Sequence, residues 1–449
     1  MRASRYNVWV EQNGADFLYN GMSGALLKLG TGERDALERY LAGARDSGCS
    51  AALLEGLARG RMLVSDETDE VQLLAKRYEL SRYDTSRLAL TIVTSLGCNF
   101  DCPYCFEDKH PSILGKEVEA ACLQLLKDQL PRIHSFHVGW YGGEPLVGKR
   151  PLLSLSKAFI GLCDEAGVAY GADIITNGYM LDEQTCRELQ ECRVATAQIT
   201  LDGPPDVHNR MRPLAGGGPT FDRIIENLHH AVDYFGVAVR VNVDGENYPR
   251  VEELLGILAA HGLSGRLQVY LGQLVAVDDG GSAPSATYRS PCFTSKEFAA
   301  AEMAFTELAM RYGFSAPSVP APVGAPCTAV RSNELILGSD CELYKCWKSV
   351  GNPQHVIGNI RDYQNTNGRL RRWLSYDPFT NDECRSCIAL PVCMGGCAHH
   401  GMDVLQYENR CDTFRHNYED RIALMARSVE AGVVPVAVAA ASGPRMDTR

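Results

Sequence analysis

The sequence has no apolar stretch long enough to span a bilayer and no excess of positive charge. Its apolar runs, such as Ile257–Ala260, fall far short of the roughly 20 residues that a membrane helix needs. The 449 residues include 44 Lys and Arg against 55 Asp and Glu, and the formal net charge of −11 repels phosphate backbones. Met1–Asn7 shows no apolar core of a signal peptide. We therefore expect a cytoplasmic protein with neither a membrane nor a nucleic acid as its partner.

A disordered or low-complexity composition is also absent, because 45% of the residues are hydrophobic and 22% are charged. The residue in excess is cysteine. Without a signal peptide, 17 cysteines favour metal ligation over disulfides. One dense group starts at Cys98 and another lies between Cys327 and Cys411. We interpret most of the scattered cysteines as small buried hydrophobes; these are Cys49, Cys122, Cys163, Cys186, Cys192 and Cys292.

Residues 1–85 are predicted to form a small α+β unit. Tyr6–Glu11 and Asp16–Asn20 alternate like two strands across an Asn-Gly turn, which is a strong hairpin pattern. The other expected elements are helices near Gly32–Ala42 and Ala51–Ala58, a short strand at Arg61–Val64 and a helix over Asp66–Tyr83. This order fits a compact, winged-helix-like domain, and equally an N-terminal extension that packs on the main domain.

From residue 88 strands alternate with helices, which favours parallel βα units and an α/β fold. The β-rich runs are Leu88–Thr94, Phe136–Trp140, Ala172–Thr176, Ala197–Leu201, Val237–Val243 and Leu267–Leu271. The helical segments between them include Lys116–Leu130, Asp182–Glu191, Phe221–Tyr234 and Arg250–Ala260. Six units predict a partial (β/α)6 barrel over residues 86–275 rather than a closed eightfold barrel. Active residues should then gather at the C-terminal ends of the strands.

The rest of the chain shows no pattern of a second large apolar core. Residues 276–320 are expected to form a linker and a helix, the helix over Ser295–Tyr312. Residues 321–428 are irregular and rich in cysteine, which suits a domain held by inorganic clusters. Residues 429–449 are rich in small residues and are expected to form a mobile tail or a fraying helix.

Three cysteines follow the first expected barrel strand with the spacing C-x3-C-x2-C. Cys98, Cys102 and Cys105 can converge on one metal face only if the backbone wraps tightly around it. Three ligands leave one position of a four-metal cluster open, and an open position is where chemistry occurs. The alternative is a zinc knuckle, although zinc sites usually show paired C-x2-C or Cys/His sets.

This loop resembles that of radical S-adenosylmethionine (SAM) enzymes, and the resemblance extends over residues 88–275. It implies that the triplet binds a [4Fe–4S] cluster, that SAM chelates the fourth iron, and that a 5′-deoxyadenosyl radical forms and removes a hydrogen atom. Segments at successive strand ends match the family in order, with an aromatic residue near the adenine, a Gly-Gly-Glu-Pro segment at the SAM ammonium and an arginine at its carboxylate. The SAM contacts implied in this way are Tyr104, Gly142, Gly143, Glu144, Thr176, Asn177, Thr200, Asp202 and Arg212.

The downstream cysteines resemble the SPASM extension of certain radical SAM enzymes, which implies two auxiliary [4Fe–4S] clusters. The implied ligands are Cys384, Cys387, Cys393 and Cys411 for one cluster, and Cys327, Cys346 and Cys397 for the other. Two clusters need eight thiolates, so we predict Cys341, which replaces a glycine of the family pattern, as the missing ligand, with Cys292 in reserve. The alternative is a structural zinc module. We interpret His399 and His400 as polar loop residues rather than ligands.

Three clusters suggest electron delivery to, or removal from, a substrate radical. SPASM enzymes that resemble this chain modify peptides or proteins, and a smaller group oxidises small alcohols. Residues 1–85 resemble the leader-recognition element of peptide maturases, which captures a leader as an added strand at a sheet edge. Sulfatase maturases begin close to the triplet and place an Asp after the equivalent of Cys346, where this chain has Trp347. Both features favour a peptide crosslinker.

We therefore predict a radical SAM/SPASM maturase that installs a thioether or carbon–carbon crosslink in a ribosomally made precursor peptide. The leader would dock on residues 1–85, and an external donor of the flavodoxin or ferredoxin type would supply electrons. The alternatives are a radical SAM dehydrogenase of a small molecule or of a sulfatase-type side chain, and a non-enzymatic iron–sulfur or zinc scaffold. No general base is identified; Tyr270 and Gln273 are interpreted as packing residues or SAM contacts.

Overall fold

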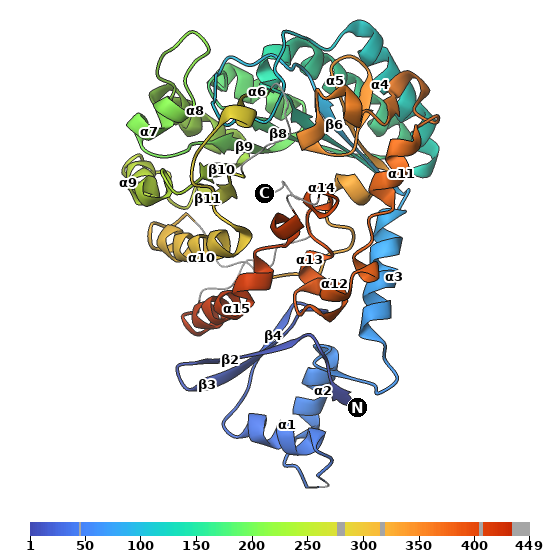
Figure 1. Cartoon of the computed structure of the whole chain (residues 1–449), viewed down its shortest axis with the longest axis vertical. Helices are drawn as coiled ribbons and strands as arrows, with labels where there is room; N and C mark the ends of the chain where they lie inside the picture. Colours follow the sequence, from blue (N-terminus) through green and yellow to red (C-terminus); the bar gives the residue numbers. More distant parts are fainter. Residues whose placement is uncertain (45, 276–282, 315–318, 404–406, 433–449) are drawn as a thin grey trace.

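A nine-stranded sheet forms the centre of the computed structural model, which describes residues 1–44, 46–275, 283–314, 319–403 and 407–432 (Figure 1). The strand order is β11-β10-β9-β8-β7-β6-β12-β13-β14. The six predicted barrel strands are all present and parallel: β6 (Arg87–Val93), β7 (Ser135–Tyr141), β8 (Ala169–Thr176), β9 (Val194–Thr200), β10 (Gly236–Val243) and β11 (Leu267–Gln273). The predicted partial barrel is confirmed.

Helices cover one face of this sheet, and the strands are rich in apolar residues because that face is buried under the helices. Leu88, Leu90 and Ile92 of β6 share a single buried cluster with residues of the helices. The helices of this layer are α4 (Lys116–Gln129), α5 (Lys149–Ala166), α6 (Glu183–Glu191), α7 (Pro205–Met211), α8 (Phe221–Tyr234), α9 (Val251–Ala260) and α10 (Ser295–Arg311). The other face is turned toward the C-terminal region (Figure 1).

The sheet continues past β6 into the cysteine-rich region, which the sequence did not predict. β12 (Glu334–Leu337) pairs in parallel with β6, and β13 (Glu342–Tyr344) and β14 (Gly358–Asn359) follow in antiparallel. The other elements of this region are short: α11 (Gly368–Leu374), α12 (Asp382–Ser386), α13 (Leu390–Cys393) and α14 (Ala398–Gly401), before the longer α15 (Phe414–Glu430). Residues 276–282 of the predicted linker and 433–449 of the predicted tail lie outside the described residues.

The N-terminal segment forms an antiparallel sheet of three strands, β2 (Asn7–Gln12), β3 (Ala15–Asn20) and β4 (Ala25–Lys28). The predicted hairpin is confirmed, with positive φ at both turn residues, Asn13 and Gly14. β4 was not predicted. The remaining elements are β1 (Arg2–Ala3), paired with β5 (Leu63–Val64), and helices α1 (Glu33–Leu41), α2 (Ala51–Arg59) and α3 (Glu70–Arg82).

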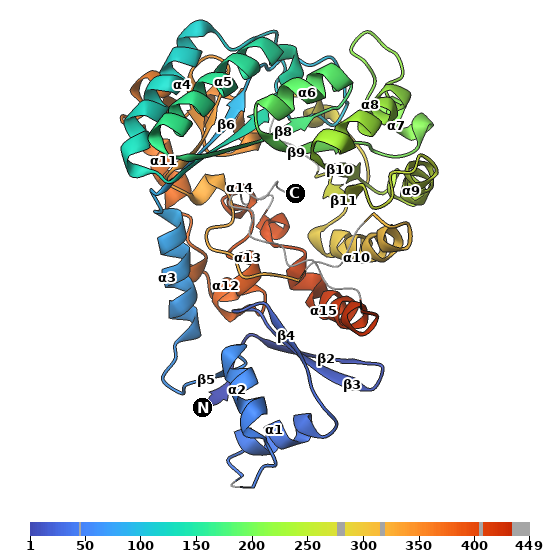
Figure 2. The same ribbon diagram turned by 180° about the vertical axis from the view of Figure 1, so that it is seen from behind.

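This N-terminal sheet contributes to two apolar clusters. Leu18 packs with residues of α1 and α2, such as Leu37 and Leu57. Phe17, on the other face, joins a cluster that includes Phe414 of α15. Both views of the ribbon place the C-terminal elements between the barrel and this sheet, with α3 alongside them (Figure 2). No helix in the described part of the chain is long and apolar enough to cross a membrane.

Candidate functional site

The loop after β6 and the turn after β7 lie in direct backbone contact. Gly143 N donates to Ser95 O at 3.0 Å, and Glu144 N donates to Gly97 O at 3.1 Å. Gly142 has a φ of +140°, and a Cβ there would lie 2.2 Å from Ser95 O. Only glycine permits this approach, so the Gly-Gly pair fixes the position of the cysteine loop relative to β7.

The three cysteines of this loop are largely shielded from water. Burial raises the pKa of Cys98 to about 11 and that of Cys105 to about 12, and it also raises the pKa of Cys102. The positive charge of Lys109 opposes the shift at all three cysteines. Thiolates at these positions therefore need additional positive charge, which iron bound to them supplies.

Glu144 is fully buried and joins the ends of β7 and β8. Its carboxylate accepts hydrogen bonds from Thr176 Oγ1 and Asn177 N, both at 2.7 Å, and from Leu146 N at 3.0 Å. Burial raises the pKa of Glu144, and these donors oppose the shift. Asn177 Nδ2 also donates to Asn99 Oδ1 at 2.7 Å, which ties the end of β8 to the cysteine loop.

Tyr104 lies at the centre of a second buried network. Its hydroxyl donates to Asp202 and accepts hydrogen bonds from Arg212 Nη1 at 2.6 Å and Asn242 Nδ2 at 3.2 Å. Burial raises the pKa of Asp202, and the neighbouring Arg212 opposes the shift. The Nε–H of Arg212 is buried and has no hydrogen-bond partner among the described residues. Thr200, at the end of β9, is also buried.

Two residues of this region were missed by sequence reasoning. Asn242 lies in β10, and only its place near a strand end could have indicated it. Glu107 follows the cysteine triplet, where a charged side chain suggests a solvated loop, but the side chain is buried. Burial raises the pKa of Glu107 to about 7, and the nearby Tyr141 hydroxyl opposes the shift.

Residues 92–258 match the profile of the radical SAM superfamily. Over 327 residues the chain is 23% identical to the serine-type anaerobic sulfatase-maturating enzyme of Klebsiella aerogenes, covering 68% of this chain and 77% of the relative. The protein is a radical SAM enzyme. As in this superfamily generally, SAM and a [4Fe–4S] cluster are its cofactors.

Solved structures share the fold of the enzyme. anSMEcpe with bound AdoMet aligns with a TM-score of 0.55 at 18% identity, covering 77% of this chain and 98% of that one. Streptococcus suis SuiB bound to its precursor peptide SuiA aligns with a TM-score of 0.52 at 16% identity, covering 92% and 99%. The predicted family, with SPASM-type relatives, is confirmed.

The residues of the enzyme fit these cofactors. Three cysteines on one short loop supply thiolates to three irons of a cluster. The unpartnered Nε–H of buried Arg212 is a donor available to the carboxylate of SAM. At Gly142 the cysteine loop and β7 lie so close together that no side chain fits between them. This close packing suits a cofactor site.

The C-terminal cysteines of the enzyme form two groups. Burial raises the pKa of Cys346, and the neighbouring Cys397 and Cys327 add to the shift. In the second group, burial raises the pKa of Cys384, and the neighbouring Cys411 and Cys387 add to the shift. Tyr376 lies near both groups. Burial raises the pKa of Tyr376, and the neighbouring Cys384, Cys393 and Cys397 add to the shift.

Cys341, the predicted fourth ligand of the first group, has different neighbours from Cys346, and its role as a ligand stays a prediction. It precedes β13 and Cys346 follows it, so the extended strand carries them to opposite ends. Cys341 is 1% exposed, has a φ of +77°, and lies near Cys122 of α4. The reserve candidate, Cys292, lies near Tyr288, whose hydroxyl donates to Asp244 at the end of β10.

The structure also bears on the alternative of a zinc site and on the roles of four further residues. No three His, Cys, Asp or Glu side chains of the described residues are arranged to hold a single metal ion. His400 contacts Asn409 O at 3.1 Å and Lys348 Nζ at 2.9 Å, and the His399 ring stacks on Trp373. Tyr270 donates to Gln198, and Gln273 donates to Phe293 O at 2.8 Å, as packing residues do.

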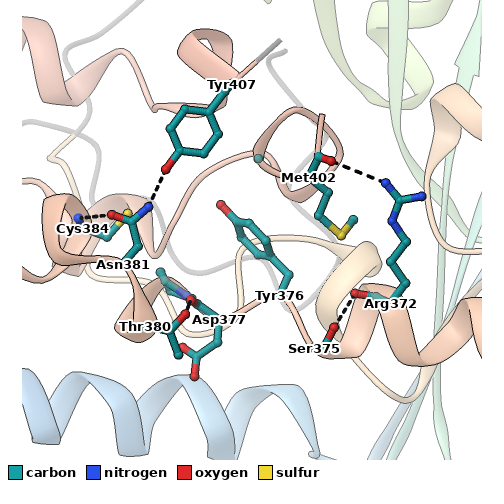
Figure 3. A pocket seen from close by; sticks show the side chains of 11 residues that line it. Arg372, Ser375, Tyr376, Asp377, Thr380, Asn381, Cys384, Met402 and Tyr407 are labelled. Carbon is teal, nitrogen blue, oxygen red and sulfur yellow. Dashed lines mark hydrogen bonds between the residues drawn. The ribbon is translucent and has the colours of Figure 1, made fainter. Parts of the chain in front are cut away.

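A cavity of about 430 Å³ lies beside the second cysteine group (Figure 3). Cys384 lines it, together with Tyr376, Tyr407 and Met402. Asn381 holds two sides of the cavity together, because its Nδ2 donates to Tyr407 and its Oδ1 accepts from Cys384 N at 3.3 Å. Polar and aromatic side chains therefore lie beside the second cysteine group.

Proposed function

We propose that the enzyme is a peptide maturase that installs a thioether or carbon–carbon crosslink in a ribosomally made precursor peptide. The observation that carries this proposal is the N-terminal sheet, which lies ahead of the barrel. The alignment with SuiB, a structure bound to a precursor peptide, covers 92% of this chain, against 77% for anSMEcpe. β4 forms one edge of the sheet, and an extended leader could add there as a further strand.

When bound, the reduced cluster and SAM would supply the abstraction of a hydrogen atom from the peptide. Cys98, Cys102 and Cys105 would hold the cluster. Arg212, positioned by Tyr104 and Asp202, would bind the SAM carboxylate, and the Gly142–Glu144 segment and Asn177 would hold its ammonium end. Thr176 positions Glu144, and Thr200 lies at the end of β9.

We assign two auxiliary [4Fe–4S] clusters to the two C-terminal cysteine groups. Cys384, Cys387, Cys393 and Cys411 hold one, and Cys327, Cys346 and Cys397 hold the other through three thiolates. Such clusters supply electron transfer with the substrate. An external carrier of the flavodoxin or ferredoxin type completes the cycle. We propose that electrons from this carrier reach the cluster through the cavity at Cys384.

Modification of a sulfatase-type side chain is the second candidate. The similarity to the Klebsiella aerogenes enzyme, which covers 77% of that relative, favours it. Trp347 opposes it, because this bulky apolar residue follows Cys346 where sulfatase maturases place a carboxylate. Its ring packs edge-on against Tyr141, with the centroids 4.6 Å apart, so no acid–base group is available from that position.

The test is co-expression with a candidate precursor peptide encoded by a small open reading frame near the gene, followed by mass spectrometry of the peptide. We expect a product lighter by two hydrogen atoms per crosslink, and no change with a Cys98→Ala/Cys102→Ala/Cys105→Ala variant. Removal of the leader should lower the yield, because residues 1–85 bind it. An unchanged peptide in both cultures, or SAM cleavage stimulated by a sugar or aminocyclitol instead, would reject the proposal.

A further inference from the structure

An arginine side chain contacts a sulfur atom of the second cysteine group. Arg415 Nη1 donates a hydrogen bond to Cys411 Sγ at 3.0 Å. The chain turns back between these two residues, because Arg415 N donates to Asp412 O and Phe414 N donates to Asp412 Oδ1, both at 3.0 Å. A hydrogen bond from a cation is stronger than one from a neutral donor, and it favours the more negative state of its acceptor.

A second arginine, next to Cys411 in the sequence, is buried. Arg410 is 2% exposed, and its guanidinium lies over the Tyr407 ring, 3.5 Å from the ring centroid. Tyr407 borders the cavity at Cys384 (Figure 3). The backbone O of Arg410 accepts from Cys397 N at 2.8 Å, which ties this residue to the other cysteine group. Because a guanidinium keeps its proton, Arg410 adds a permanent positive charge here.

One carboxylate pairs with both arginines. Glu383, which precedes Cys384 in α12, accepts from Arg410 Nη2, and its Oε2 lies 3.8 Å from Arg415 Nη1. The side chain of Glu383 is 59% exposed, against 35% for Arg415 and 3% for Arg410. Water and salt screen an exposed charge more than a buried one. Glu383 therefore offsets only part of the positive charge at Cys411 Sγ.

We propose that Arg415 raises the reduction potential of the cluster assigned to the second cysteine group, and that Glu383 limits this effect. The inference rests on the cluster assignment in the proposed function. A [4Fe–4S] cluster that gains one electron becomes more negative by one charge, and a cationic N–H donor at a ligand sulfur stabilises that state. The external carrier loses this electron, and no bond is made or broken. Arg415 acts through Cys411 and is a positioning residue for electron transfer.

The test is a reductive titration of the full-length enzyme, purified without oxygen and followed by electron paramagnetic resonance. The signal of this cluster is the one that disappears in Cys411→Ala, together with about four iron atoms per chain. Arg415→Met keeps an unbranched side chain but removes the charge and the donor. We expect the equilibrium constant for reduction to fall about tenfold, which lowers the midpoint potential by about 59 mV for one electron.

The matched control is Arg427→Met, in the last turn of the same helix. Arg427 pairs with Glu307 of α10, and its side chain is 42% exposed, close to the 35% of Arg415. Its replacement should leave the midpoint potential of this cluster unchanged. A midpoint that is the same in wild type and Arg415→Met, at equal iron content, would overturn the proposal.

Glu383→Gln covers the case in which Arg415→Met does not hold its cluster. This change removes an exposed carboxylate and leaves both arginines in place, so the midpoint potential should rise, opposite to the effect of Arg415→Met. A role in packing alone predicts no such reversal of sign. A midpoint that falls or stays constant in Glu383→Gln, with the iron content of wild type, would count against the proposal and reject it.

The titration needs no peptide, so its outcome is separate from that of the crosslinking test. A midpoint that responds to Arg415→Met, together with an unmodified peptide, would reject the maturase and keep the role of Arg415. A crosslinked peptide from an enzyme whose midpoint does not respond would keep the maturase and reject that role. Full iron content in Cys411→Ala would reject the cluster assignment and this inference with it.

Discussion

Gly142 lies at the contact between the cysteine loop and β7, and residues with a side chain rarely adopt its φ of +140°. We expect Gly142→Ala to destabilise the protein by about 1–3 kcal/mol and to lower its iron content, because the added Cβ would collide with Ser95 O. The free energy of unfolding and the iron per chain are the measurements.

Gly161→Ala is the matched control for this prediction. Gly161 lies within α5, and nothing comes within 4 Å of a Cβ placed there. This change should stabilise the protein by about 0.5–1 kcal/mol and leave the iron content unchanged. Equal stability of the Gly142→Ala and wild-type proteins would contradict the account of the contact.

Cys341 and Cys346 provide a second comparison. Cys341→Gly should keep the full iron content, because Cys341 has different neighbours from Cys346 and glycine tolerates its φ of +77°. Cys346→Ala should lose one cluster, which is about four iron atoms per chain. Chemical analysis of iron and sulfide distinguishes the two, and an equal loss in both variants would support Cys341 as a ligand.

Sequence spacing indicates those parts of the site whose residues lie close together in the chain. The triplet at Cys98–Cys105 is recognisable from its spacing alone. Cys341 was assigned by counting thiolates, but a count does not say on which end of a strand each thiol lies. Glu107 was missed because burial of a single charged side chain depends on contacts with Tyr141 and other distant residues.

At the scale of elements, α3 connects the N-terminal sheet to the rest of the chain. Its Leu74 and Tyr78 belong to the main apolar core, and Tyr78 OH donates to Tyr376 O at 3.0 Å. Asp69 caps the helix by accepting from Gln72 N, so α3 starts later than the predicted Asp66. α3 is thus held by a local cap at its start and by a contact distant in sequence at Tyr78.

We expect Tyr78→Phe to lower the free energy of unfolding by about 1 kcal/mol, because Tyr376 O loses its donor in a buried position. Tyr83→Phe, at the exposed end of the same helix, should have no measurable effect. Urea unfolding followed by circular dichroism tests both. A Tyr78→Phe protein with the midpoint of wild type would contradict this role of the helix.

The barrel strands could be predicted because each is a run of apolar and β-branched residues between helical segments. β12 and β13 could not, because each is very short and β12 pairs with β6, far away in the sequence. β4 was missed for a similar reason: its four residues continue a sheet whose hairpin alone has a clear turn pattern.

At the scale of the whole molecule, the N-terminal segment is both a small unit and a part of the main body. Leu37 and Leu57 pack within the segment, whereas Phe17 and Tyr19 pack with Phe414 of α15. Tyr19 OH also donates to Pro320 O at 2.5 Å. A leader bound to the sheet would thus be connected through α15 to the cysteine-rich region.

The most direct test of the account is the iron and sulfide content of the protein purified without oxygen. Three [4Fe–4S] clusters predict about twelve of each per chain, and about eight when Cys98, Cys102 and Cys105 are all replaced by Ala. A colourless protein that holds zinc, with the same metal content in that variant, would contradict the central claim that the chain is a three-cluster radical SAM enzyme.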